Sequence, residues 1–509
     1  MIDLKDQNVL ILGLGASGLA MARWCAHLGA RVTVADTREQ PPNLGALLAD
    51  VPKAEFLPGA FDPSQVTGRN FARVFVSPGL TPALIAPILV ACDGHFTRPG
   101  GELDLFTSAL EDLKHSRGYS PKVLAVTGTN GKTTVTALTG QLIERAGKSV
   151  AVAGNIGPSL LDTLTERLDS GDLPEVWVLE LSSFQLHAAE GFEPTAATVL
   201  NISQDHLDWH GSMQAYAQAK AKVFGASGLM LLNRNDAAVM AMLPVAAIAG
   251  NVKDRKVPPV REHLSFGADA PTRPGDFGIE EVNGMAWLVR AQDADGARRK
   301  RNEAPEELFV QRLMPADALR IRGRHNAVNA LAALALASAA GCALAPMLYG
   351  LREYRGEPHR VESIGTVNGV EFFDDSKGTN VGATVAALSG LGADRKLVVI
   401  LGGDGKGQDF APLAGPVSKF ARSVVLIGRD APAIRAALNA SQVPLSDAGS
   451  MHEAVAIANR AAHAGDAVLM SPACASFDMF DNYGHRAAVF CDAVKGLANE
   501  AGLALEAQA

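Results

Sequence analysis

One short stretch constrains this chain more than any other: Lys122 to Thr134, which reads KVLAVTGTNGKTT. It predicts a strand over Val123–Val126, then a glycine-rich loop, then a helix from Lys132. The N–H groups of such a loop and of the helix N-terminus point at one spot, which favours a polyphosphate. Because Val126 replaces the first glycine of the usual motif, we predict a shortened phosphate loop, not an ordinary glycine turn with a surface lysine. Its residues are Gly128, Thr129, Asn130, Gly131, Lys132, Thr133 and Thr134.

Composition narrows the class of protein. A length of 509 residues favours three domains. With 48% hydrophobic and only 6% aromatic residues, the chain is typical of α/β proteins. A net charge of −8 argues against binding to nucleic acid or to an anionic membrane.

The chain carries few signals for export or membrane insertion. Its five cysteines are scattered, which disfavours zinc and disulfide scaffolds and fits the cytoplasm. The N-terminus leads straight into a strand, so we expect no export signal. The apolar run Ala327–Leu348 is alanine-rich and contains Asn329, so we predict a buried helix and no membrane span.

Residues 1–120 predict a Rossmann-like domain. A strand over Asn8–Leu14 is followed by Gly13-x-Gly15-x-x-Gly18, and the next strand ends at Asp36. This fingerprint places backbone against a diphosphate, which a dinucleotide or a nucleotide-sugar satisfies equally well. A second tight loop, Ser77-Pro78-Gly79, follows a later strand at the same sheet edge.

Residues 121–356 predict a central domain around the phosphate loop. A strand over Val176–Leu179 delivers Glu180 to the edge where a Mg²⁺ ligand belongs, although a helix-capping acid fits too. A strand over Thr198–Ile202 leads to His206, which is either a minority Mg²⁺ ligand or an ordinary histidine. We expect residues 244–316 to be loops or an insertion, with the basic Arg298–Arg301 cluster a solvated face.

A helix near Gln214–Phe224 carries an unusual lysine. Tyr216, Lys220 and Phe224 recur at helical spacing, so Lys220 lies on the inward face and Lys222 on the opposite one. A buried lysine must find an anion, lose its proton or be modified. A lysine that snorkels to solvent remains an alternative.

Residues 357–509 predict a third α/β unit. Pro358-His359-Arg360 precedes a hairpin at Asn368-Gly369. Three polar loops then follow strands, and we expect them to bind a small zwitterion and the far side of the nucleotide: Asp374–Asn380, Gly402–Lys406 and Ser471–Asp478.

Taken together and in order, these motifs resemble the Mur ligases, in particular the branch that adds D-glutamate. The motifs that carry the resemblance are GLGASG, DTR, SPG, TGTNGKTT, GNIG, LELSSFQL, NISQDHLD, YAQAK, GRHN, PHR, DDSKGTN, GGDGKG and SPACASFD. The YGHHP-type loop and the DNPR motif of two sister branches are absent from the sequence.

The resemblance implies an α/β fold of three domains: an N-terminal Rossmann-like UDP-binding domain, a central P-loop ATPase-like domain and a C-terminal Rossmann-like domain. It implies an ATP-dependent ligase that joins D-glutamate to UDP-N-acetylmuramoyl-L-alanine through an acyl phosphate, for peptidoglycan synthesis. A cytoplasmic monomer is expected, with the third domain closing on ATP.

The resemblance also assigns roles to single residues. Positions that hold the UDP moiety are Ala16, Ser17, Asp36, Thr37, Arg38, Ser77 and Gly79. Positions along the sugar and alanine are Asn155, Ser182 and His206. Positions around the adenine nucleotide are Asn326, Arg360, Asp375 and Lys406. Positions of the D-glutamate pocket are His359, Lys377, Thr379, Ser476, Phe477 and Tyr483, with Phe477 in place of a common Leu and Tyr483 in place of a common Phe.

The same resemblance implies that one Mg²⁺ is held through Thr133 and Glu180 and a second near His206. It also implies that Lys220 is carbamylated and so supplies an anion on the side of the site where the metal ions bind. The residues expected to carry the chemistry are Lys132, Glu180, His206, Lys220, Arg360 and Lys377. Three alternatives remain: a sister Mur-type ligase, an NAD-dependent oxidoreductase that rests on the glycine fingerprint alone, and a non-catalytic nucleotide-binding regulator.

Overall fold

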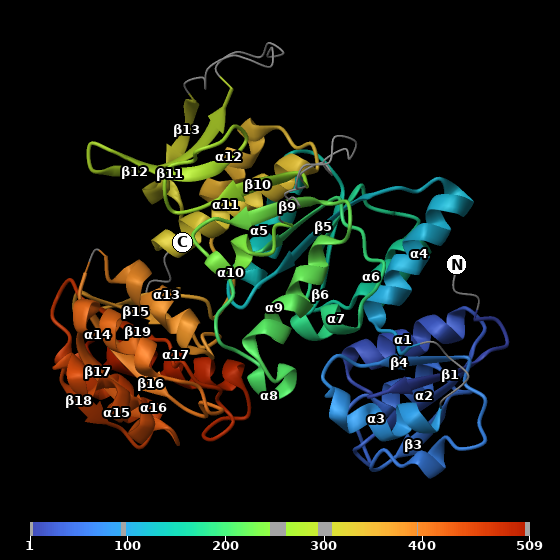
Figure 1. Ribbon diagram of the computed structural model, residues 1–509. Helices are drawn as coiled ribbons and strands as arrows, with labels where there is room; N and C mark the ends of the chain where they lie inside the picture. The colour runs from blue at the N-terminus through green and yellow to red at the C-terminus, as the bar shows by residue number, and fades with distance from the viewer. Residues whose placement is uncertain (1–3, 93–97, 245–260, 294–307, 394, 504–509) are drawn as a thin grey trace, which may run out of the picture.

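The computed structural model describes residues 4–92, 98–244, 261–293, 308–393 and 395–503. In this part of the chain three β-sheets form, each flanked by helices (Figure 1). One sheet falls within each of residues 1–120, 121–356 and 357–509, which we call the N-terminal, central and C-terminal units. The predicted three-part α/β organisation is confirmed.

The N-terminal unit holds a parallel sheet in the order β3-β2-β1-β4. Its strands are β1 (Asn8–Leu12), β2 (Arg31–Asp36), β3 (Glu55–Pro58) and β4 (Arg73–Val76), and its helices are α1 (Ala16–His27), α2 (Leu44–Asp50) and α3 (Pro82–Ala91). Because β1 lies between β2 and β4, the loops after β1 and β4 meet at a switch point. A Cβ on Gly13, whose φ is +89°, would lie 2.8 Å from the Ser77 Cβ, so this close approach requires glycine.

The N-terminal and central units share one apolar core. Helix α1 packs against α4 (Glu102–Arg117) and α6 (Leu160–Ser170), and buried residues of both units form one cluster. Within it, the ring of Phe106 on α4 meets the ring of Trp177 on β7 edge to face, with centroids 5.1 Å apart. The shared core fixes how the two units face each other.

The central sheet has the order β13-β12-β11-β10-β9-β8-β5-β7-β6. Its parallel strands are β5 (Lys122–Thr127), β6 (Val150–Gly154), β7 (Val176–Glu180), β8 (Ala196–Val199), β9 (Leu229–Asn233), β10 (His263–Phe266) and β11 (Phe277–Val282); β12 (Met285–Gln292) and β13 (Phe309–Pro315) continue it antiparallel. Its remaining helices are α5 (Lys132–Arg145), α7 (Ser183–Ala188), α8 (Leu207–His210), α9 (Met213–Ala221), α10 (Ala237–Met240), α11 (Arg324–Ala339) and α12 (Leu344–Glu353). Strand β5 lies between β8 and β7, so the loops after these three strands lie side by side.

Three local predictions in this unit were wrong. The expected loops of 244–316 contain β10–β13, and half-exposed positions, as along the edge strand β13, weaken the alternation that marks a strand. The predicted strand over Thr198–Ile202 ends at Val199, because Leu200 and Asn201 turn aside to bond the phosphate loop. The run Ala327–Leu348 forms parts of α11 and α12, not one helix. The basic Arg298–Arg301 cluster lies outside the described residues.

No helix of the described chain is long and apolar enough to cross a membrane.

The prediction that Lys220 lies on the inward face of its helix is confirmed. On α9, Lys220 is buried, whereas Lys222 at the following 3₁₀ turn η2 (Lys222–Phe224) is exposed.

The C-terminal unit holds a sheet in the order β14-β15-β19-β16-β17-β18. Its strands are β14 (Glu362–Val367), β15 (Val370–Asp374), β16 (Leu397–Gly402), β17 (Ala421–Ile427), β18 (Leu445–Asp447) and β19 (Ala467–Met470). Its helices are α13 (Val381–Leu391), α14 (Ala414–Phe420), α15 (Ala431–Leu438), α16 (Met451–Ala461) and α17 (Tyr483–Glu500). Short 3₁₀ turns elsewhere are η1 (Pro63–Gln65), η3 (Ala316–Ala318), η4 (Ala411–Leu413) and η5 (Asn439–Ser441).

The predicted β14–β15 hairpin at Asn368-Gly369 is confirmed, and it is the antiparallel pair of this sheet. Strands β15, β19 and β16 are neighbours and run parallel. The three polar loops that follow them therefore meet at one edge, as the sequence predicted.

Candidate functional site

The phosphate loop joins β5 to α5 at the middle of the central sheet. Gly128 and Gly131 both have positive φ, and Gly131 immediately precedes α5. A Cβ on Gly131 would lie 2.9 Å from the side-chain oxygen of Asn329, so glycine is required there. Four loop residues, Gly128 to Gly131, thus lead into a helix N-terminus that offers free N–H groups to an anion.

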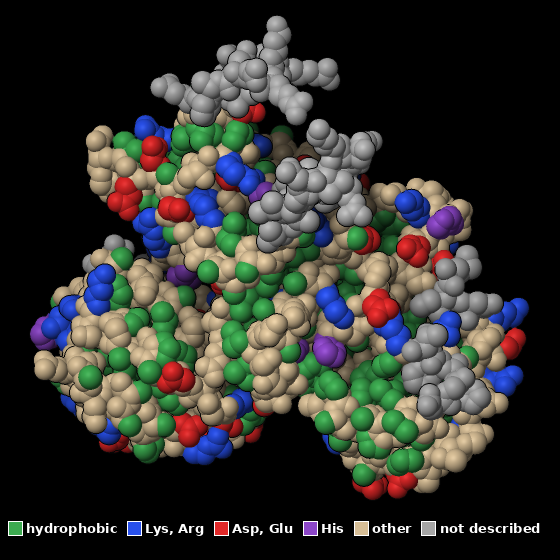
Figure 2. Space-filling model, viewed as in Figure 1, with side chains coloured by type: hydrophobic (Ala, Val, Ile, Leu, Met, Phe, Trp, Pro, Cys, Tyr) green, Lys and Arg blue, Asp and Glu red, His purple; other side chains and the backbone are tan. Residues whose placement is uncertain are grey.

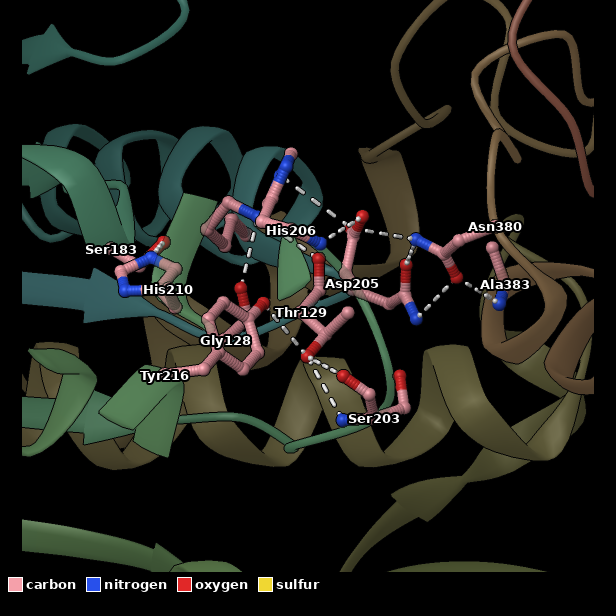
Figure 3. A network of polar contacts seen from close by, with 12 residues as sticks. Gly128, Thr129, Ser183, Ser203, Asp205, His206, His210, Tyr216, Asn380 and Ala383 are labelled. Carbon is pink, nitrogen blue, oxygen red and sulfur yellow. Dashed lines mark hydrogen bonds and ion pairs between the residues drawn. The ribbon is translucent and has the colours of Figure 1, made fainter. Parts of the chain in front are cut away.

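A second segment holds the loop in shape. The Asn201 side chain accepts from the Asn130 N–H at 2.8 Å and donates to the Asn130 carbonyl at 3.0 Å. Thr129 is fixed in the same way, because its hydroxyl accepts from the Ser203 N–H at 3.0 Å and from the Tyr216 hydroxyl at 3.1 Å (Figure 3). The residues that leave the sheet after β8 therefore preorganise the loop.

Two lysines converge on one carbonyl oxygen of this loop. Lys132 Nζ and Lys220 Nζ each donate to the Gly128 carbonyl at 2.9 Å. Only 2% of Lys220 is exposed, and its Nζ lies 4.7 Å from the centre of the Tyr216 ring. Burial, and then the charge of Lys132, hold the pKa of Lys220 well below its usual value. Burial also lowers the pKa of Lys132. Among the described residues no carboxylate forms an ion pair with either lysine, although the charges of Glu180 and Asp205 attract both.

Glu180 ends β7 beside the loop and has a free oxygen. It is 1% exposed, and its Oε1 accepts from Asn155 Nδ2 at 3.0 Å. Its Oε2 is buried without a hydrogen-bond partner among the described residues. An unpartnered buried carboxylate oxygen is costly unless a cation takes it, so Glu180 fits the predicted Mg²⁺.

His206 lies on the other side of the loop, at the start of α8. Its φ is +53°, and its ring packs edge to face on Phe184 with centroids 4.7 Å apart. Nε2 lies 3.6 Å from Oδ2 of Asp205. Desolvation lowers the pKa of His206, so the imidazole is neutral near pH 7, which is the form that ligates metals.

The C-terminal unit reaches the phosphate loop through two contacts. Arg360 donates to the Thr133 hydroxyl at 2.6 Å. Asn380, which caps α13, exchanges side-chain hydrogen bonds with Asn130 at 3.1 and 3.3 Å and donates to Asp205 at 3.2 Å (Figure 3). Arg360 thus joins the C-terminal unit to the residue that follows Lys132.

A cavity opens between the central and C-terminal units beside these contacts. It brings together Asn130, Gly131 and Thr134 of the loop with the predicted Asn326, Arg360, Asp375 and Lys377. Burial raises the pKa of Asp375 to about 7. Lys406 is not among the described residues that line this cavity: its loop pairs instead with Ala475 through Asp404.

The predicted UDP residues gather around the switch point of the first sheet. Asp36, at the end of β2, accepts from the Leu14 N–H at 2.7 Å and pairs with Arg38 at 2.8 Å. The Arg38 guanidinium lowers the pKa of Asp36 to about 2. Ala16 and Ser17 open α1, Thr37 is exposed, and Gly79 follows β4.

A cleft separates this switch point from the central unit, and hydrophobic side chains line its N-terminal wall (Figure 2). Ser77 and Pro78 face Gln185 and Trp209 across it. Ser182, by contrast, is used as a helix cap, because its hydroxyl accepts from the Gln185 N–H at 3.2 Å.

The predicted amino-acid pocket forms from the loops of the third sheet. The His359 ring lies 6.1 Å from that of Tyr483, and Lys377 Nζ lies 5.2 Å from the Tyr483 ring centre. His359 Nδ1 contacts the buried Asp374 carboxylate at 2.7 Å. Ser476 is buried, Thr379 is half-buried and Phe477 is 69% exposed.

Sequence reasoning missed four residues that the site uses: Asn201, Asp205, Asp374 and Asn380. Each lies inside a quoted motif, and Asn380 directly precedes a helix, which is the signal of an N-cap. Its pairing with Asn130, 250 positions away, leaves no local pattern to detect.

The comparisons with known proteins agree with this geometry over most of the chain. Residues 7–92 match the N-terminal domain of MurD-like Mur ligases, residues 126–337 match the Mur ligase middle domain, and residues 359–474 match the glutamate ligase domain of Mur ligases. The chain belongs to the Mur ligase family. Members of this family are ATP-dependent ligases that form amide bonds, and this Mur ligase is one of them.

Curated relatives cover the whole of this Mur ligase. A UDP-N-acetylmuramoylalanine–D-glutamate ligase of Albidiferax ferrireducens is 69% identical and is covered over 100% of both chains. Proteins of the same name from Polaromonas sp. and Burkholderia mallei are 58% and 57% identical, covering 99% of this chain and 100% and 99% of their own. The predicted resemblance is confirmed.

Solved structures share the fold. A MurF ligase from Thermotoga maritima in complex with ADP has a TM-score of 0.55 at 14% identity, covering 98% of this chain and 96% of that chain. A UDP-N-acetylmuramate–alanine ligase from the same organism has a TM-score of 0.54 at 19% identity, covering 96% and 99%. These likenesses establish the three-part architecture.

The two hydrogen bonds between Asn201 and Asn130, which we call the Asn201 clamp, lead to a testable prediction about nucleotide binding. Asn201→Ala removes both hydrogen bonds to Asn130 and leaves a loop N–H and carbonyl without their partner. Because losing such a pair costs about 1–3 kcal/mol, we expect Mg·ATP to bind roughly tenfold or more weakly in titration calorimetry. Asn499→Ala, at an exposed position of α17, is the control and should bind as the wild type does. Equal affinity in both variants would contradict the clamp.

Proposed function

We propose that this Mur ligase adds D-glutamate to UDP-N-acetylmuramoyl-L-alanine, using ATP, in the synthesis of peptidoglycan precursors. The observation that carries the proposal is the contact of Arg360 with Thr133, which joins the amino-acid unit to the phosphate loop. The names of the full-length relatives support the choice of substrates.

The chemistry proceeds in two displacements. An oxygen of the alanine carboxylate attacks the γ-phosphorus of ATP, and the bond from that phosphorus to ADP breaks. The D-glutamate amine then attacks the acyl carbon of the acyl phosphate, the carbon–oxygen bond breaks, and phosphate leaves as the amine loses a proton. Phosphoryl transfer of this kind depends on positioning and charge neutralisation.

The residues of the chain supply that neutralisation from two directions. Lys132 comes from the phosphate loop and Arg360 from the C-terminal unit. Asn326, Arg360 and Asp375 line the proposed nucleotide cavity. Closing of the C-terminal unit would complete the site, since its ligands come from all three units.

Magnesium fits the donors on either side of the loop. Glu180 with its free Oε2, together with Thr133, would hold one ion, and neutral His206 would stand beside a second. Mg²⁺ supplies charge that stabilises the phosphoryl group during transfer.

Lys220 is proposed to be carbamylated. A neutral amine attacks carbon dioxide and loses a proton, which gives a carbamate anion. The lowered pKa of Lys220 favours the neutral amine that this step needs. The resulting anion would face Lys132. It would replace a buried amine with a negatively charged group on the side of the site where Mg²⁺ is proposed.

The remaining substrate contacts follow the two clefts. UDP and sugar contacts are proposed for Ala16, Ser17, Asp36, Thr37, Arg38, Ser77, Gly79, Asn155, Ser182 and His206. D-glutamate contacts are proposed for His359, Lys377, Thr379, Ser476, Phe477 and Tyr483. Nucleotide contacts are proposed for Asn326, Arg360, Asp375 and Lys406. A cytoplasmic monomer remains the expected form.

The reaction and its specificity are tested by phosphate release. With ATP and UDP-N-acetylmuramoyl-L-alanine present, we expect release with D-glutamate and background rates with L-glutamate, L-alanine or diaminopimelate. Release with another amino acid would assign the chain to a sister branch of the family. Background release with all four would contradict the proposed reaction and favour the non-catalytic regulator.

The carbamate is tested by chemical rescue. We expect Lys220→Ala to lower turnover on the order of 10²-fold or more, because it removes the anion proposed for the metal side and thereby weakens the charge that stabilises the transferring phosphate. Acetate or formate should restore part of that turnover by filling the vacated space with a carboxylate. Gln218→Ala, at an exposed position of the same helix, is the matched control and should keep wild-type turnover. Full turnover in Lys220→Ala, or its loss without rescue, would contradict the carbamate.

A further inference from the structure

Arg486 lies in the first turn of α17, directly beneath the proposed amino-acid pocket. It is 1% exposed and is among the largest fully buried side chains of the described chain. Asn482 caps this helix by accepting from the His485 N–H at 2.9 Å, so the turn that carries Arg486 is fixed.

The guanidinium of Arg486 joins two loops that are distant in sequence. One nitrogen donates to the Ser376 carbonyl at 2.7 Å and another to the Cys474 carbonyl at 3.0 Å. The first carbonyl belongs to the loop that carries Lys377 and Thr379. The second belongs to the loop that carries Ser476 and Phe477. One side chain thus sets the spacing between both groups of proposed D-glutamate contacts.

The same helical turn also forms a wall of the pocket. Tyr483, three residues before Arg486, lies against the His359 ring and the Lys377 ammonium. A shift of the turn would move the two loops and this wall together.

Burying an arginine here is costly, and the cost indicates a role. No carboxylate of the described residues lies within ion-pair distance of Arg486, and its Nε has no hydrogen-bond partner there. Desolvation lowers its pKa to about 10, offset partly by attraction to Asp374, Asp478 and Asp375, so the group stays charged at neutral pH. An apolar side chain would fill the space more cheaply, but it could not donate to the two carbonyls, which the planar guanidinium holds through two separate nitrogens in a fixed geometry.

We propose that Arg486 is a positioning residue of this ligase: it clamps the Ser376 and Cys474 carbonyls and thereby sets the geometry of the pocket that binds the amino acid. The inference rests on the proposed function for the identity of that amino acid. Arg486 is thus assigned to the binding of D-glutamate, whereas the contact of Arg360 is assigned to the binding of the nucleotide.

The test compares Arg486→Lys and Arg486→Met in the full chain. Lysine keeps the charge but cannot bridge two carbonyls in a fixed plane, and methionine keeps only the bulk. We expect both variants to raise the KM for D-glutamate about tenfold or more, with the KM values for ATP and for UDP-N-acetylmuramoyl-L-alanine within about twofold of wild type. Lys495→Met, exposed on the same helix, should leave all three unchanged.

A second readout omits D-glutamate. Exchange of labelled ADP into ATP, measured with phosphate and the UDP substrate, reports acyl-phosphate formation alone, and we expect both variants to keep it. A normal D-glutamate KM in Arg486→Lys would overturn the clamp, because charge alone would then suffice. An equal rise in all three KM values, or loss of the folded state in both variants, would also overturn it and assign Arg486 to stability. A wild-type enzyme without D-glutamate-dependent turnover would instead refute the proposed function.

Discussion

The whole structure depends on a constraint at the centre of the central sheet: two desolvated lysines converge on one carbonyl of the phosphate loop. Lys132 and Lys220 share the Gly128 carbonyl, and Arg360 reaches Thr133 from another unit. Because burial and the charge of Lys132 lower the pKa of Lys220, the site favours an uncharged or modified Lys220 and leaves Lys132 and Arg360 to face a polyphosphate. The order β8-β5-β7 creates this site, because the loops that follow three adjacent parallel strands must meet.

The units around this centre are held in different ways. The N-terminal and central units share an apolar core through α1, α4 and α6, so the cleft between them has a fixed shape. The C-terminal unit meets the phosphate loop through polar side chains, Asn380 and Arg360. Polar contacts of this kind can exchange for contacts with ligand at little cost. The nucleotide and the amino acid can thus enter beside the C-terminal unit, where polar contacts and not an apolar core join the units.

Much of this site was predictable because its residues follow strands in short, ordered motifs. The phosphate loop, Glu180 and the inward face of Lys220 were read from local spacing alone, and the structure places them together. The pairing of Asn380 with Asn130 and the clamp from Asn201 were not readable, since they depend on the tertiary fold. Strands β10–β13 were missed because half-exposed side chains, as along the edge strand β13, blur the alternating pattern.

The central claim is that the site turns a carboxylate into an acyl phosphate before the amine attacks. Isotope transfer tests this most directly. UDP-N-acetylmuramoyl-L-alanine labelled with ¹⁸O in its carboxylate is incubated with ATP, Mg²⁺ and D-glutamate, and the released phosphate is analysed by mass spectrometry. The account predicts that each phosphate carries one labelled oxygen from the substrate. Unlabelled phosphate alongside normal product formation would contradict it.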